Sequence, residues 1–235
     1  MPDAFSEAAG NGRLRVARRG VCLVLASPSG GGKTSVMRRL VESDPGIARS
    51  VSATTRAPRE GERDGVDYLF RTEAEFAELV RSGGMLEHST VFGRSYGIPR
   101  APVEEALARG TDLVFVIDWQ GHRILRDKLP GDVVGVFLMP PSLGDLERRL
   151  VGRGDLVCEA RRRMADAPAE ISHWGEFDHV VVNDSLASAT EEVRAALSAA
   201  RTATRRLAGA ALLAASMTGH NPDAAPPGRA GPGSR

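Results

Sequence analysis

Cysteine, aromatic side chains and lysine are all scarce in this chain of 235 residues. The two cysteines, Cys22 and Cys158, lie far apart and lack the spacing of metal ligands, so a small scaffold held by disulfides is excluded. Aromatic residues make up 5% of the chain, but hydrophobic residues make up 42%, which is ample for a large core. This cysteine usage is typical of the reducing cytoplasm.

Long apolar runs and a net charge are missing as well. No stretch approaches the roughly 20 apolar residues of a membrane span, and the first 20 residues contain no apolar segment of the signal-peptide kind. The formal net charge of +1 is too balanced to indicate general nucleic-acid binding. We therefore expect a soluble cytoplasmic protein without a nucleic-acid or membrane partner, and the sequence leaves a homo-oligomer open.

Strand-like and helix-like segments alternate through most of the chain. Four short runs rich in β-branched residues are typical of strands buried on both faces, and they cover residues 21–26, 113–117, 133–139 and 179–183. Helices are expected over residues 33–42, 72–82, 102–109, 120–129, 142–152, 159–171 and 186–206. The alternation predicts an α/β fold, a parallel sheet flanked by helices, with ligands at the carboxyl ends of the strands.

Three parts of the chain depart from this alternation. Residues 1–19 have no apolar periodicity and are expected to form a disordered leader. Residues 208–235 are rich in Ala, Pro and Gly and are expected to form a low-complexity tail. Residues 51–98 contain short, polar, strand-like pieces around one helix, which predicts a small inserted subdomain of mixed strands.

The stretch "SPSGGGKT" directly follows the first apolar run and precedes a predicted helix. This is the order of a phosphate-binding loop, in which glycines let backbone N–H groups surround an anion at a helix start. Only Lys33 and Lys128 are lysines among the 31 basic residues, so a lysine at this place carries information. The simpler alternative is a flexible connector. The predicted loop comprises Ser27, Pro28, Ser29, Gly30, Gly31, Gly32, Lys33 and Thr34.

A second polar stretch, "SVSATTRAPREGERDGVDYLF", concentrates hydroxyl and guanidinium groups. Its Ser52, Arg56, Arg59 and Tyr68 suit a phosphomonoester, because Arg offers forked donors to phosphate oxygens and the hydroxyls add neutral ones. A charged surface loop in a chain biased toward arginine is the alternative, and composition does not separate the two.

Taken with "SPSGGGKT", "YGIPRAPVEEAL", "VIDWQG", "PPSLGDLERRL" and "VVVND", this stretch resembles guanylate kinases, from about residue 12 to residue 207. The resemblance implies a P-loop NTPase-type fold that transfers the γ-phosphoryl group of ATP to GMP with Mg²⁺, giving ADP and GDP. It implies a domain over residues 20–207, with core segments 20–50, 99–148 and 164–207, a GMP-binding subdomain over 51–98 and a small helical lid over 149–163. Two alternatives stay open: an inactive binding module of this family, and a kinase for another small phosphate ester.

The resemblance also implies the roles of individual residues. The residues expected to bind GMP are Ser52, Arg56, Arg59, Tyr68, Glu87, Tyr96 and Asp118. Those expected to take part in catalysis are Lys33, Arg56, Arg149, Arg153 and Arg163. Asn183 is expected to read adenine as part of the ATP site, and Thr34 and Asp118 to hold Mg²⁺, partly through water. Glu87 is expected to read guanine, because a carboxylate accepts from the N1–H and 2-amino groups that adenine lacks.

The chain departs from the family pattern at a few positions. Ser27 replaces the first glycine of the phosphate loop, Ile98 stands where a hydroxyl residue follows "YG", and Val116 stands where an acid is common. The lid is one residue short, so Arg162 is the alternative to Arg163. Pro168 is expected to end or kink the helix that follows the lid.

Overall fold

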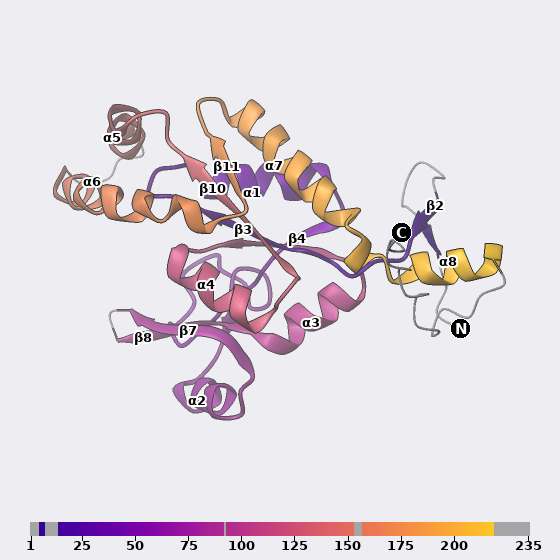
Figure 1. Ribbon diagram of the computed structural model, residues 1–235. Helices are drawn as coiled ribbons and strands as arrows, with labels where there is room; N and C mark the ends of the chain where they lie inside the picture. The colour runs from indigo at the N-terminus through magenta and orange to yellow at the C-terminus, as the bar shows by residue number, and fades with distance from the viewer. Residues whose placement is uncertain (1–4, 8–13, 92, 153–156, 219–235) are drawn as a thin grey trace, which may run out of the picture. The chain divides into compact units, whose positions relative to one another are not determined.

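The computed structural model describes residues 5–7, 14–91, 93–152 and 157–218, which fall into two compact units (Figure 1). Gly20–Ala200 form one unit, and the terminal segments form the other. This larger unit holds all the predicted site residues that the structure describes. None of the described helices is long and apolar enough to cross a membrane.

A parallel sheet of five strands lies at the centre of the larger unit, in the order β11-β10-β3-β9-β4. The strands are β3 (Cys22–Ala26), β4 (Ile47–Arg49), β9 (Asp112–Val116), β10 (Val133–Met139) and β11 (His179–Val182). Every residue of β3 is buried, as expected for a strand covered on both faces. The parallel α/β prediction is therefore confirmed. Strand β4 was not predicted, because three residues are too few to produce a pattern.

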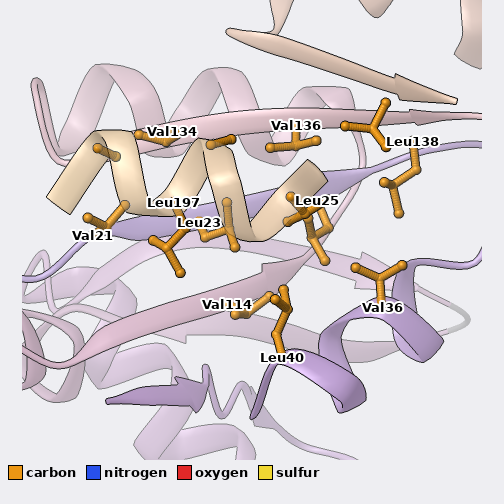
Figure 2. Close-up of a cluster of buried hydrophobic side chains, with 14 of the residues drawn as sticks. Val21, Leu23, Leu25, Val36, Leu40, Val114, Val134, Val136, Leu138 and Leu197 are labelled. Carbon is orange, nitrogen blue, oxygen red and sulfur yellow. The ribbon is translucent and has the colours of Figure 1, made fainter. Parts of the chain in front are cut away.

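Helices cover both faces of this sheet, and each face has its own hydrophobic core (Figure 1). One core joins the sheet to α1 (Lys33–Ser43) and α7 (Leu186–Arg201), and Figure 2 shows its labelled side chains meeting between these elements. The other joins it to α3 (Arg100–Ala108) and α4 (Trp119–Lys128). Side chains of β3 point alternately to the two faces of the sheet, so Leu23 belongs to the first core and Val24 to the second.

Two further helices, α5 (Leu143–Gly152) and α6 (Val157–Ser172), follow β10. Pro168 lies inside α6, which continues to Ser172, so the expectation that the helix ends there is wrong. A proline removes only its own N–H from the helix, and the neighbouring turns keep theirs. The predicted helix over 186–206 is also too long, since α7 ends at Arg201 and a short 3-10 helix, η2, covers Thr204–Arg206.

The inserted segment folds as a second sheet of mixed direction, in the order β6-β5-β8-β7. Its elements are β5 (Ala53–Thr54), β6 (Leu69–Phe70), α2 (Glu73–Arg81), β7 (Met85–Val91) and β8 (Arg94–Pro99). A small core of Ala53, Phe76 and Met85 holds it together. Helix α2 starts with a capping box, in which Thr72 and Glu75 bond to each other's backbone N–H groups.

The terminal unit contains secondary structure that the sequence did not predict. The short strands β1 (Phe5–Glu7) and β2 (Leu14–Val16) pair antiparallel inside the expected disordered leader, and α8 (Ala208–Thr218) lies inside the expected tail. The leader and tail predictions included none of these elements. Three-residue strands leave no periodicity to detect, and Ala-rich sequence has high helix propensity even without an apolar face. Residues 219–235 of the expected tail lie outside the described residues.

Candidate active site

The phosphate loop connects β3 to α1, as predicted. Gly30 and Gly32 have φ angles of 88° and 100°, in the left-handed region that favours glycine. A Cβ atom on Gly31 would lie 2.2 Å from Oγ of Ser27, and one on Gly32 would lie 2.2 Å from Nδ2 of Asn183. The buried Ser27 hydroxyl donates to the carbonyl oxygen of Pro28 at 3.0 Å. The Ser27 side chain thus packs against the loop, and residue 31 must be glycine to leave room for it.

Lys33 and Asn183 are both held against this loop. The Lys33 ammonium donates to the carbonyl oxygen of Ser27 at 2.5 Å and lies 3.5 Å from that of Pro28, so it points toward the loop and not into solvent. Nδ2 of the buried Asn183 donates to the carbonyl oxygen of Gly31 at 2.8 Å. In turn, Arg149 donates from its guanidinium to the carbonyl oxygen of Asn183 at 2.7 Å. The structure gives Asn183 a role in shaping the loop, and its reading of adenine stays a prediction.

One cavity of about 290 Å³ joins the two predicted phosphate sites. Thr34 of the phosphate loop lines it, together with Ser52 and Tyr68 of the predicted acceptor site. It lies at the carboxyl ends of β4 and β9, where a parallel sheet presents ligands. The remaining lining residues are Met37, Arg49, Ser50, Ile98, Val114, Phe115, Val116 and Ile117.

A larger and more open hollow, of about 660 Å³, lies between α1 and α7. Of the predicted site residues that the structure describes, none lines it. Arg194 on its wall is already bonded to Ser43 at 2.9 Å and to Glu191 at 3.4 Å. We place the active site at the smaller cavity because loop, acceptor residues and strand ends meet there.

Arg56 is the centre of the acceptor site. Its guanidinium lies over the rings of Tyr68 and Phe70, 5.4 and 5.8 Å from their centroids, and the Tyr68 and Tyr96 rings meet edge to face at 6.2 Å. A carboxylate oxygen of Glu62 accepts from Arg56 at 2.8 Å, and its other oxygen accepts the backbone N–H of Arg59 at 2.7 Å. The hydrogen bond between Arg56 and Glu62 is the main reason that the pKa of Glu62 is lowered and that the pKa of Arg56 is raised.

Glu87 and Asp118 lie within electrostatic range of each other. Burial raises the pKa of the half-buried Glu87, and the charge of Asp118 raises it further. Glu87 is the cross-strand partner of Ile98, which is 2% exposed and lines the cavity, so both side chains lie on one side of that sheet. One oxygen of Asp118 accepts the backbone N–H of Gly121 at 2.8 Å and so caps α4.

The arginines expected in the lid are only partly placed. Arg153 lies outside the described residues. Arg163 is half-buried on α6, whereas Arg162 beside it is exposed, which favours Arg163 as the residue that faces the site. The described residues contain no cluster of three or more metal-binding side chains, and the binding of Mg²⁺ by Thr34 and Asp118 stays a prediction.

Comparison with known proteins agrees with this geometry. The family model described as guanylate kinase matches residues 19–200. The chain belongs to the guanylate kinase family. Proteins named guanylate kinase from Granulibacter bethesdensis and Rhodospirillum rubrum are 57% and 49% identical to it, over 80% and 87% of this chain and 89% and 94% of theirs. A crystal structure of guanylate kinase from Anaplasma phagocytophilum has a TM-score of 0.66 at 37% identity, covering 85% of this chain and 95% of that one.

Two carboxylates of this guanylate kinase fold were missed by sequence reasoning. Glu62 contacts both predicted phosphate-binding arginines, and its place six residues after Arg56 was the only available signal. Glu170 is half-buried on α6, and burial raises its pKa, while the charge of Lys33 opposes this rise and that of Asp118 adds to it. No spacing in the sequence indicates that residue 170 lies near residues 33 and 118.

Proposed function

We propose that this chain transfers the γ-phosphoryl group of ATP to GMP, giving ADP and GDP. The single observation that carries the proposal is the cavity shared by Thr34 of the phosphate loop and by Ser52 and Tyr68 of the acceptor subdomain. A transfer between two nucleotides needs their phosphate groups to meet in one space, and catalysis is then mostly alignment and charge stabilisation. The family membership supports an enzyme, a nucleoside monophosphate kinase, over an inactive binding module.

Each residue has a place in the proposed reaction. The loop glycines and Lys33 would bind the ATP phosphates. The phosphate of GMP would be held by Ser52, Arg56, Arg59 and Tyr68, with Tyr96 as a further donor. Glu87 would select guanine, since a buried carboxylate left unpaired by another base costs enough to reject it by a factor of about 10⁴. Arg149, Arg153 and Arg163 would neutralise the charge of the transferring group.

A magnesium ion bound with ATP fits the available side chains. Mg²⁺ keeps several waters and is usually bound through substrate phosphates and one or two protein oxygens. The hydroxyl of Thr34 and the carboxylate of Asp118 supply such oxygens, Asp118 through water. When bound, the ion would neutralise charge on the phosphate oxygens. We also propose a cytoplasmic location, because ATP is the donor and both cysteines are free thiols.

Turnover with a panel of phosphate acceptors tests the function. ADP release is measured with MgATP and GMP, AMP, UMP, CMP or sugar phosphates in turn. GMP is expected to be used far better than the others. Turnover with another acceptor and none with GMP would favour a kinase for a different phosphate ester. Failure to bind MgATP in calorimetry would favour the binding module.

A further inference from the structure

A cluster of side chains outside the cavity joins the start of α4 to the end of α6. The indole ring of Trp119 stacks on the imidazole of His173, with centroids 3.6 Å apart and planes 13° from parallel. The guanidinium of Arg123 lies 4.5 Å from the centroid of the same indole. None of these three residues contributes to the nucleotide sites described above. We call Trp119, His173, Arg123 and Glu176 the α4–α6 clamp.

Hydrogen bonds fix the polar side of the clamp. Arg123 donates from Nε and Nη2 to the two carboxylate oxygens of Glu176, at 2.6 and 2.5 Å. The same carboxylate contacts Nδ1 of His173 at 2.6 Å. These contacts lower the pKa of Glu176 to about 2, with the Arg123 bond as the main cause and the His173 bond next. The clamp is thus a connected network, with Glu176 charged at any physiological pH.

Both ends of the clamp adjoin the reaction site. Trp119 is the first residue of α4 and follows Asp118 directly. His173 follows the last residue of α6, and its backbone N–H lies 3.4 Å from the carbonyl oxygen of Glu170. Glu170 in turn lies within electrostatic range of Lys33 and Asp118. A shift of the α6 end would therefore move a carboxylate relative to the phosphate loop.

We propose that Trp119 and His173 are positioning residues for phosphoryl transfer, and that their stacked rings hold the end of α6, with Glu170, against the start of α4 beside Asp118. The inference rests on the proposed function. Trp119 and His173 would act through Glu170 at the end of α6, without contacting a nucleotide. Displacing a catalytic group by about 1 Å can cost up to about 100-fold in rate.

Paired substitutions of the two tryptophans test the proposal. Trp119→Leu removes the ring and keeps an apolar side chain, while Trp119→Phe keeps a stacking surface. Trp174→Leu is the matched control, because Trp174 is 51% exposed and adjoins His173 in the chain. We expect Trp119→Leu to lower kcat about tenfold with the KM values for ATP and GMP nearly unchanged, Trp119→Phe to recover most of the loss, and Trp174→Leu to behave as wild type.

A double-mutant cycle tests whether the clamp acts through Glu170. If it does, Trp119→Leu should lower kcat little further in a Glu170→Gln background. If the two residues act independently, the two losses in kcat should multiply. Multiplied effects would overturn the proposal. So would a Trp119→Leu protein with wild-type kcat, or one in which Trp119→Phe is no better than Trp119→Leu. Melting temperatures of all variants show whether any loss of rate is a loss of folded protein.

A fluorescence measurement separates this inference from the proposed function. In a Trp174→Phe protein Trp119 is the remaining tryptophan, and the emission of an indole depends on the groups in contact with it. His173→Leu should change the intensity or the wavelength of this emission if the stack exists in solution. No change would overturn the inference alone. A wild-type protein inactive with GMP but with the stack present would overturn the function alone.

Discussion

The phosphate loop and the predicted acceptor site are expected to bind similar groups but are built in different ways. The loop is shaped by backbone: positive φ angles at Gly30 and Gly32, and carbonyl oxygens that accept from Lys33 and Asn183. The acceptor site is shaped by side chains, with Arg56 held between aromatic rings and the Glu62 carboxylate. The loop is continuous in sequence, whereas the predicted acceptor residues are spread over strands β7 and β8 of the second sheet and the loops that precede them.

This difference predicts how each site fails. A backbone site tolerates little change in shape, but much of its binding comes from N–H groups that no substitution removes. A site made of side chains loses affinity one contact at a time, and each contact can be removed without disturbing the others. Substitutions should therefore affect kcat most at the loop and the KM for GMP most at the acceptor site.

The largest effect is expected at Lys33. Lys33→Ala should lower kcat by about 100- to 1,000-fold, because the ammonium stabilises charge on the transferring phosphoryl group. The melting temperature should change little, since the backbone of the loop remains. Lys128→Ala is the matched control, because Lys128 is the other lysine of the chain and is exposed at the end of α4. Steady-state rates of ADP release make the comparison, and equal losses in the two variants would contradict the role of Lys33.

The next largest effect is expected at Glu87. Glu87→Gln should lower kcat/KM for GMP by about 100-fold, because an amide cannot accept from both guanine donors, and the KM for ATP should stay the same. Since burial raises the pKa of Glu87, its charged form destabilises the folded protein at neutral pH, and the variant should melt slightly higher. Glu73→Gln, on the exposed start of α2, is the control. Equal loss of GMP and ATP affinity would place Glu87 elsewhere than the guanine site.

A smaller effect is expected at Glu62. Glu62→Gln weakens the bonds that hold Arg56 and the backbone of Arg59, so the KM for GMP should rise about tenfold. The KM for ATP should not change. Glu60→Gln, an exposed residue of the same loop, is the control. Tighter binding of GMP by the Glu62 variant would show instead that this carboxylate competes with the phosphate for Arg56.

Acid should separate the two sites without any substitution. Glu87 accepts hydrogen bonds from guanine only when ionised, and its pKa is raised, so the KM for GMP should begin to rise at a higher pH than an ordinary glutamate would allow. The loop is expected to bind ATP mainly through backbone N–H groups, which do not titrate in this range, so the KM for ATP should be flatter on the protein side. Both KM values measured from neutral to mildly acidic pH test this, and parallel rises would contradict it.

The smallest effect is on stability and involves His122. This histidine is 1% exposed, stacks on Phe177 with centroids 4.2 Å apart, and has no hydrogen-bond partner for either ring nitrogen among the described residues. Burial lowers its pKa, so the unfolded chain takes up the proton first, and stability should fall as pH drops below about 6.5.

Urea unfolding at about pH 7.5 and about pH 5.5 measures this change in the free energy of unfolding. His122→Phe should reduce the difference between the two pH values, and His179→Gln, an exposed histidine on β11, should leave it unchanged. An equal difference in wild type and His122→Phe would assign the acid sensitivity to another group.

The features that the sequence predicted are those that depend on local patterns, and the features that it missed depend on contacts between distant residues. The loop, the five-stranded parallel sheet apart from β4, and the mixed subdomain were predictable, because each depends on local composition and on order along the chain. Glu62 and Glu170 were not, since their roles come from contacts that only the folded chain makes. The terminal strands and α8 were missed because short strands and uniformly apolar helices leave no periodic signal.

The chain contains two tyrosines, and both lie in the predicted acceptor site, where their rings meet edge to face and the Arg56 guanidinium lies over the ring of Tyr68. The two phenol rings are therefore natural reporters of this site. NMR signals of labelled tyrosine should shift when GMP enters, and they can be followed with ATP already bound.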